Sequence, residues 1–440
     1  MIPTPHTAHD FFGSRRRLFR LWVLTVCCLL LTACTNASAV PTEIPQGLEG
    51  VSDGCRIKIG IITSLTGEYQ NRAVELVQGY DMARDDINAA GGLLNCQLDL
   101  VYRDDASLST QAVAGMRELV ETEQVLLVVG SFASVITLDL VPLSSQYQIP
   151  LLAHNSTNFL ITDLRYKWIF RTMPSSWNSM DQLLRYTSQL PLGDLPSVAL
   201  LYEDSAYGQD IYVSLLSRLK TYSLSLVSAQ PIPSGADNYE PLLQRMRESG
   251  ADVLFLAGNS VSDGLRLMEQ MKALDLNFKA YLTNGGAFTS VEFTQSPYAN
   301  YFLAPVPWVS TTLLNDELSS QTTQEFIAHF KERYGTEPGY RTVNAYTNIY
   351  LAKVAIENAL PMNEGRSIAD IRHAIRDELQ SLDVQETLFG PIRFNEFGQN
   401  TAQILLTQRL DGQFIVLDPD PETASDVIVP APDWRKRETP

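Results

Sequence analysis

The stretch from Arg56 to Asp105 constrains the fold of this chain more than any other, because it reads as a strand, a helix and a second strand in direct succession. Arg56–Ile62 is a short run rich in isoleucine, and a β-branched run of this length predicts a buried strand. From Val74 onward apolar residues recur at helical spacing until Gly91-Gly92, where glycine readily ends a helix. A second apolar run then leads to Asp105. This order predicts a right-handed βαβ unit in a parallel sheet.

The motifs in this unit occur in an order that is similar to one protein family. Ile57–Gly67 reads IKIGIITSLTG, Asp81–Gly92 reads DMARDDINAAGG, and the second strand ends in Arg103-Asp104-Asp105. This sequence of motifs resembles the start of the leucine/isoleucine/valine-binding protein family, the type I periplasmic solute-binding proteins of ABC importers. The resemblance extends over residues 56–417. It implies an α/β fold of two doubly wound parallel-sheet lobes that are joined by three hinge crossings and close on a ligand.

The resemblance also implies where the lobes begin and end. Residues 55–172 and 309–384 are expected to form the N-terminal lobe, and residues 173–308 and 385–417 the C-terminal lobe. Trp168–Pro174 resembles the first crossing, Tyr301–Val309 the return crossing and Gly390–Gly398 the closing hairpin. Residues 418–440 are rich in proline and acidic side chains and are expected to be a disordered acidic tail.

Residues 1–34 have the composition of a lipoprotein signal peptide. A basic segment at Arg15–Arg20 leads into the apolar run Leu18–Leu31, which is too short to be a dependable membrane span. Leu31–Cys34 resembles a lipobox, in which Cys34 receives the lipid and becomes the mature N-terminus. A plain secretory signal without a role for Cys34 is the alternative, and Ser14-Arg15-Arg16 leaves twin-arginine export open. Residues 35–54 are expected to be a flexible tether.

The net charge and the hydropathy of the rest of the chain exclude several classes of partner. The formal charge of −17 argues against nucleic acid, whose phosphates an acidic protein repels. No later stretch approaches the roughly 18 apolar residues of a membrane helix. We therefore expect a monomer that contacts the membrane through its lipid only.

Two cysteines lie beyond the leader, Cys55 and Cys96, and each immediately precedes a predicted strand. In the fold that the resemblance implies, these strands are neighbours in a parallel sheet, which brings the two side chains within disulfide reach. An exported compartment is oxidising enough to join them. A metal-binding pair is the alternative, and it has no histidine partner nearby.

Four loops at the carboxyl ends of the predicted strands carry the candidate ligand residues, because doubly wound sheets bind ligands at that edge. Residues 131–134 and 155–157 are each expected to open a helix, whose dipole favours a carboxylate. By position in the family motif, Ser134 and Thr157 match residues that hold the ligand's α-carboxylate, and Asn155 and Ser156 belong to the same loop. Tyr207 matches a tyrosine that faces the cleft. The alternatives are that both hydroxyls cap helices and that Tyr207 packs on the lobe surface.

Departures from the family pattern bear on the choice of ligand. Arg72 stands where the family's amino-acid binders have an aromatic residue, and Asn284 stands where they have a glutamate that pairs with the α-ammonium. A neutral amide forms a weaker bond than a carboxylate, so Glu203 or Asp204 is the candidate substitute. Arg72 either meets an acidic ligand or is an ordinary solvated arginine. Asn259 or Ser260 lies where the family often has pocket-lining residues. We therefore expect leucine, isoleucine and valine to bind more weakly than an acidic or non-amine solute.

No pattern in the chain predicts an enzyme, a cofactor or a metal site. Gly258–Ser262 begins like a nucleophile elbow but ends in serine. The histidines beyond the leader, His154, His329 and His373, have no metal-ligand spacing. We therefore expect an exported, lipid-anchored, extracytoplasmic solute-binding protein that delivers a small polar solute, an amino acid or a related compound, to an ABC permease. A ligand-sensing lipoprotein that reports to a membrane receptor is the alternative.

Overall fold

A computed structural model of the chain describes residues 54–258, 260–290, 293, 296–363, 365–418 and 427–437. The predicted signal peptide, Cys34 and almost all of the predicted tether lie outside these described residues, as does Asn259. No helix within them is long and apolar enough to cross a bilayer.

The N-terminal lobe is built on a five-stranded parallel sheet in the order β2-β1-β3-β4-β5. Its strands are β1 (Arg56–Thr63), β2 (Gln97–Asp104), β3 (Val128–Gly130), β4 (Leu151–Ala153) and β5 (Ile169–Arg171). One face packs against α2 (Gln70–Ala89), α11 (Thr323–Tyr334), α12 (Tyr340–Met362) and α13 (Ile368–Ser381). The other face packs against α3 (Ser109–Glu121), α4 (Ser134–Gln146) and α5 (Leu160–Asp163).

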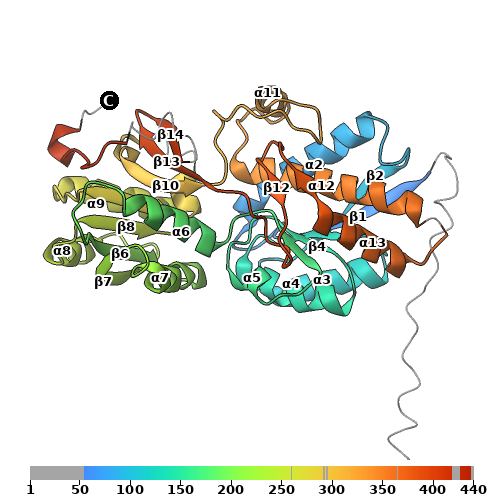
Figure 1. Cartoon of the computed structure of the whole chain (residues 1–440), viewed down its shortest axis with the longest axis horizontal. Coiled ribbons are helices and arrows are strands. Elements are labelled where there is room, and N and C mark those ends of the chain that lie inside the picture. The colour runs from blue at the N-terminus through green and yellow to red at the C-terminus, as the bar shows by residue number, and fades with distance from the viewer. Residues whose placement is uncertain are drawn as a thin grey trace, which may run out of the picture. The chain divides into compact units, whose positions relative to one another are not determined.

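The sequence of β1 explains why this strand lies inside the sheet with both faces covered. Ile59 and Ile61 belong to the core on the α2 side, whereas Ile62 belongs to the core on the α3 side. A strand that is buried on both faces reads as a continuous apolar run rather than an alternation. Helix α12 packs closely on α2 because Gly79 has no side chain; a Cβ there would lie 2.4 Å from the carbonyl oxygen of Thr342. In Figure 1 the orange α12 accordingly lies beside the blue α2, although the two are far apart in the sequence.

The C-terminal lobe is built on a seven-stranded mixed sheet in the order β14-β13-β10-β9-β8-β6-β7. Its strands are β6 (Ser197–Glu203), β7 (Ser225–Ile232), β8 (Val253–Ala257), β9 (Ala280–Asn284), β10 (Phe302–Val306), β13 (Leu405–Leu410) and β14 (Gln413–Asp418). Helices α8 (Glu240–Glu248) and α9 (Val261–Ala273) cover one face, and α6 (Ser176–Thr187) and α7 (Ala206–Arg218) cover the other. Short 3-10 helices are η1 (Gly286–Thr289), η2 (Pro297–Ala299) and η4 (Trp434–Lys436).

The third crossing lies later in the chain than predicted, so the boundary at residue 384 is wrong. Strands β11 (Asp383–Val384) and β12 (Ile392–Arg393) form a small antiparallel sheet, and Leu388, Ile392 and Phe394 belong to the core of the N-terminal lobe. The chain enters the other sheet only at β13. The hairpin that closes that sheet is β13–β14, which turns at Asp411 and Gly412, both with positive φ. Asp-Gly is a strong sequence signal for a hairpin, and it marks the closing hairpin here in place of the predicted segment Gly390–Gly398.

The C-terminal segment 427–437 packs on the C-terminal lobe, so the expectation of disorder does not hold for it. Trp434 is buried, and its indole Nε1 donates to the carbonyl oxygen of Leu276 across 2.8 Å. The Arg437 guanidinium lies 3.7 Å from the centre of the Trp434 ring. Backbone N–H groups of the segment also donate to the lobe, from Ala431 to the carbonyl oxygen of Lys279 and from Ile428 to Gln408 Oε1, each across 2.8 Å. A buried aromatic ring and a few such bonds can hold a segment whose average composition is polar.

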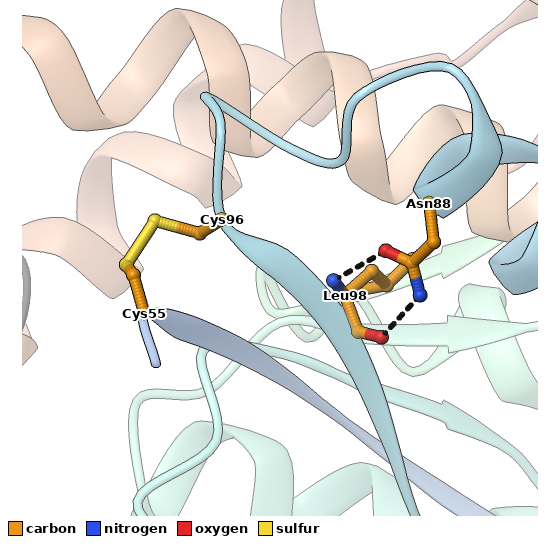
Figure 2. Close-up of a disulfide and its surroundings, with 4 residues drawn as sticks. All are labelled: Cys55, Asn88, Cys96 and Leu98. Carbon is orange, nitrogen blue, oxygen red and sulfur yellow. Dashed lines mark hydrogen bonds between the residues drawn. A yellow bond between two sulfur atoms is a disulfide. The ribbon is translucent and has the colours of Figure 1, made fainter. Parts of the chain in front are cut away.

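The predicted disulfide between Cys55 and Cys96 is confirmed. The two cysteines precede β1 and β2, their Cα atoms lie 4.9 Å apart, and their sulfur atoms are bonded. Figure 2 shows the bond at the start of the two strands, beside Asn88, whose amide makes two hydrogen bonds with the backbone of Leu98. The end of α2 and the start of β2 are thereby fixed to β1.

Candidate functional site

A cavity of about 800 Å³ lies at the carboxyl ends of the strands, and residues of both lobes line it. In the N-terminal lobe the lining comes from the loops after β1, β3 and β4 and from the start of α12. In the C-terminal lobe it comes from the loops after β6, β8 and β9. Met173, Pro305, Pro307 and Ile404, which lie at or next to the three crossings, complete the wall. This is the edge at which doubly wound sheets bind ligands.

Asp105, the residue that follows β2, holds two of the N-terminal loops in place. Its buried carboxylate accepts hydrogen bonds from the hydroxyls of Ser64, at 2.5 Å, and Ser131, at 2.7 Å. It therefore ties the loop that leads into α2, the helix of Arg72, to the loop that leads into α4, the helix of Ser134. Buried charge-assisted bonds of this kind fix the positions of lining side chains before a ligand arrives.

Ser134, Asn155 and Thr157 line the cavity together, as predicted. Ser134 begins α4, but its hydroxyl accepts from the backbone N–H of Asn158 at 3.3 Å and does not cap its own helix. The prediction that residues 155–157 open a helix is wrong, because α5 begins only at Leu160. Asn155 is 9 % exposed, and its Nδ2 has no hydrogen-bond partner among the described residues.

Ser156 does not line the cavity, so its prediction as a ligand residue is not supported. Its side chain points into the protein, where the hydroxyl donates to the carbonyl oxygen of Ser131 at 2.9 Å and lies 2.5 Å from the Thr137 hydroxyl. In an extended segment neighbouring side chains point to opposite sides, which separates Ser156 from Asn155 and Thr157. His154 is likewise buried away from the cavity, with its Nε2 atom 2.7 Å from the Tyr80 hydroxyl.

On the C-terminal wall, Tyr207 and Asn284 are brought together. The Tyr207 hydroxyl donates to Asn284 Oδ1 across 2.9 Å, which leaves Asn284 Nδ2 buried and without a partner among the described residues. Burial raises the pKa of Tyr207 well above its ordinary value, so the hydroxyl stays protonated and remains a donor. Both residues line the cavity.

Of the two candidate substitutes for the missing glutamate, Glu203 lines the cavity, whereas Asp204 is exposed and does not. Glu203 ends β6, and its Oε2 accepts from the backbone N–H of Ser260 at 3.3 Å. A carboxylate is therefore present on the same wall as Tyr207 and Asn284, but it ends β6, which is separated by β8 from β9, where the family pattern places its glutamate.

Two arginines flank Phe132 at the N-terminal wall. The guanidinium of Arg72 lies 5.8 Å from the centre of the Phe132 ring and that of Arg341 lies 5.9 Å from it, and all three residues line the cavity. Sequence reasoning missed Arg341. A signal was present, because helix dipoles disfavour a cation in the first turn and Arg341 stands in the first turn of α12.

Asp210 on α7 was also missed. It lines the cavity, is 8 % exposed, and neither carboxylate oxygen has a hydrogen-bond partner among the described residues. Burial raises the pKa of this carboxyl, while the nearby Ser176 hydroxyl and Arg171 guanidinium partly offset the effect. The Ser176 hydroxyl is close enough to favour the charged form but is not placed to bond to either oxygen.

Residues 56–413, most of the described chain, match the periplasmic binding protein family. The chain belongs to this family. The prediction from the opening βαβ unit is thereby confirmed, together with the α/β fold of two lobes. Proteins of this family bind substrates and are not enzymes, and they work outside the cytoplasm. Among the described residues no group of three or more histidine, cysteine or acidic side chains is placed to hold a metal.

Relatives and solved structures agree with this membership. The chain is 26% identical over 386 residues to Leu/Ile/Val-binding protein homolog 7 of Brucella abortus, covering 85% of this chain and 94% of the relative. It is 26% identical to homolog 8 of Brucella suis, over 89% of this chain and 96% of the relative. The fold is similar to the branched-chain amino acid transporter substrate-binding protein LivJ of Streptococcus pneumoniae, solved with isoleucine (TM-score 0.68, 19% identity, 82% and 97% covered). It is also similar to an ABC transporter solute-binding protein of Rhodopseudomonas palustris, solved with 3,4-dihydroxybenzoic acid (TM-score 0.68, 19% identity, 82% and 95% covered).

Proposed function

We propose that this protein captures a small polar solute, an amino acid or a related compound, between its two lobes and delivers it to an ABC permease. The observation that carries the proposal is the cavity, because both lobes contribute buried polar atoms to it that have no hydrogen-bond partner in the part of the chain that the structure describes. Asn155 Nδ2 belongs to the N-terminal wall and Asn284 Nδ2 to the C-terminal wall. A buried donor without a partner costs about 1–3 kcal/mol, which a bound solute recovers.

The chemistry of the relatives supports the same class of ligand. The Streptococcus protein carries isoleucine and the Rhodopseudomonas protein carries an aromatic acid, and both ligands have a carboxylate. In this chain Ser134, Asn155 and Thr157 are the proposed carboxylate site, at the uncapped start of α4. Tyr207, Asn284 and Glu203 are the proposed site for the other end of the solute. Glu203 is the proposed partner for an amine where the solute has one.

We further propose that Cys34 is lipidated and anchors the protein to the membrane. The support is the lipobox at Leu31–Cys34 and the export that family membership implies. The tether then lets the binding domain move near a membrane-embedded permease while remaining attached. We also propose that the protein acts as a monomer.

A thermal-shift screen of the purified mature protein over amino acids, amides, ureas and small carboxylates tests the binding function. A ligand that binds only the folded state stabilises it by roughly 2.7 kcal/mol at a hundredfold excess over its Kd. We expect at least one small carboxylate to raise the midpoint, and a screen without any stabilising solute would count against the function. Uptake of that solute by cells lacking the protein then separates delivery from sensing, since unchanged uptake favours the sensing alternative.

A further inference from the structure

Building on the proposed function, we propose that the solute carries a second acidic group, besides the carboxylate held at Ser134 and Thr157, and that Arg341 together with Arg72 binds it. The ligand class is therefore a dicarboxylate, either an acidic amino acid or a dicarboxylic acid. This extends the solute-binding function by naming what Arg341 and Arg72 on the N-terminal wall recognise.

Arg341 is a buried cation whose hydrogen bonds are incomplete. It is 7 % exposed and lines the cavity, and its Nε has no partner among the described residues. Its Nη1 reaches Glu75 Oε1 only at 3.3 Å, and the Glu75 side chain is 38% exposed. Burial by itself lowers the pKa of Arg341, but the nearby Tyr340 and Glu75 outweigh this effect. The pKa is therefore raised above its ordinary value, and the side chain stays charged. A guanidinium in this state still has a donor for a ligand oxygen.

The surroundings of Arg341 suit a carboxylate. The guanidinium lies over the rings of Tyr340 at 4.8 Å and Phe132 at 5.9 Å, which limits its motion and leaves its edge for hydrogen bonds. Arg72 lies on the same ring of Phe132 at 5.8 Å. A carboxylate is the group that an arginine edge binds through two parallel bonds.

The helix N-termini at the two walls differ in their capping, and the difference also favours an anion at the N-terminal wall. Helices α4 and α12 begin at the N-terminal wall, and neither has a side-chain cap, since their N-cap residues are Ala133 and Gly339. Helices α7 and α9 begin at the opposite wall and are capped by Ser205 and Ser260. Free N–H groups and the positive dipole ends therefore gather on the wall that carries Arg72 and Arg341. Asn155 Nδ2, buried and without a partner within the described ranges, adds a further donor there.

Matched pairs of probes that differ in one charge test the proposal by titration calorimetry. The pairs are L-glutamate with L-glutamine, L-aspartate with L-asparagine, and glutarate with its monoamide. We expect the doubly acidic member of at least one pair to bind at least about tenfold more tightly than its amide, because an unpaired buried charge is costly. Equal affinity within every pair that binds, or binding of neutral amino acids alone, would overturn the proposal while leaving the solute-binding function intact.

Variants of Arg341 separate recognition from folding. We expect Arg341→Met to remove the preference for the acid over its amide and Arg341→Lys to keep part of it. Arg366→Met is the matched control, because Arg366 is exposed and does not line the cavity. A preference that survives in Arg341→Met, in a protein that still unfolds cooperatively, would contradict the role of Arg341. Failure of every small solute to bind the wild-type protein would contradict the binding function itself, and this inference with it.

Discussion

The hydroxyl of Tyr207 donates a hydrogen bond to Asn284 Oδ1 across 2.9 Å and joins the first turn of α7 to the end of β9. The bond occupies the acceptor oxygen of the amide, and the donor, Asn284 Nδ2, lies buried on the cavity wall without a partner among the described residues. Asn284 thus offers a ligand an N–H group where the related amino-acid binders are expected to offer a carboxylate. This wall has a negative charge in Glu203 instead.

Substitution of either residue in this pair tests their coupling. We predict that Tyr207→Phe lowers the free energy of unfolding by about 1 kcal/mol, because Asn284 Oδ1 loses its donor. The double variant with Asn284→Ala should be less destabilised than the sum of the single variants, by about 0.5 kcal/mol or more. Urea unfolding of the four proteins measures this difference, and strictly additive effects would show that the bond contributes nothing.

Acid sensitivity is expected from His154. Burial lowers its pKa to about 3, far below the ordinary value. Between about pH 3 and 6.5 the histidine binds a proton in the unfolded state but not in the folded state. The free energy of unfolding is therefore not reduced by His154 above about pH 6.5, and it falls as the pH drops below that value.

We predict that His154→Gln, which keeps a polar partner for Tyr80, makes the unfolding free energy depend less on pH over the range from about 4 to 6.5. Urea titrations at several pH values measure the slope for both proteins. His373→Gln is the control, because His373 is not fully buried. Identical slopes for wild-type protein and His154→Gln would contradict the assignment.

The disulfide should contribute strongly to stability because it closes a long loop. Cys55 and Cys96 are separated by 41 positions, and the chain-entropy model gives about 4 kcal/mol for a loop of that length. We predict a loss of this order for the double variant Cys55→Ala, Cys96→Ala. Mass spectrometry of non-reduced peptides checks the bond directly, and two free thiols in exported protein would contradict it.

Membrane attachment should depend on Cys34. We predict that Cys34→Ala prevents lipidation, so that the protein no longer partitions with membranes after cell fractionation. Cys55→Ala serves as the matched cysteine control and should remain attached. If Cys34→Ala is processed at the same site and stays bound in the same proportion, the lipobox assignment is wrong.

Local sequence patterns were sufficient for most of the framework. The isoleucines of β1 and the glycines after α2 predicted the first βαβ unit, because a doubly covered strand and a helix end each demand particular residues. The family motif led to Ser134, Thr157, Tyr207 and Asn284, and all four line the cavity. Their loops follow strands directly, so their place in the sheet follows from the order of the chain.

Sequence reasoning failed where a distant contact decides the outcome. Arg341 lines the cavity because α12 begins there, and Asp210 lines it because α7 runs beside it. A local sequence pattern does not predict where these helices lie relative to the cavity. Ser156 is drawn inward by the carbonyl oxygen of Ser131, 25 positions away. The segment near Trp434 is held by contacts with residues far along the chain, among them the bond from Trp434 to Leu276 and the bond from the Ala431 N–H to Lys279.

Titration calorimetry with the solute that gives the largest thermal shift tests the central claim most directly. Wild-type protein, Thr157→Val from the N-terminal wall, Tyr207→Ala from the C-terminal wall and the exposed control Arg366→Met are compared. If the solute is bound between the lobes, both wall variants should lose at least about tenfold in affinity while the control matches the wild type and binds one solute per chain. Unchanged affinity in both wall variants would show that the solute binds elsewhere.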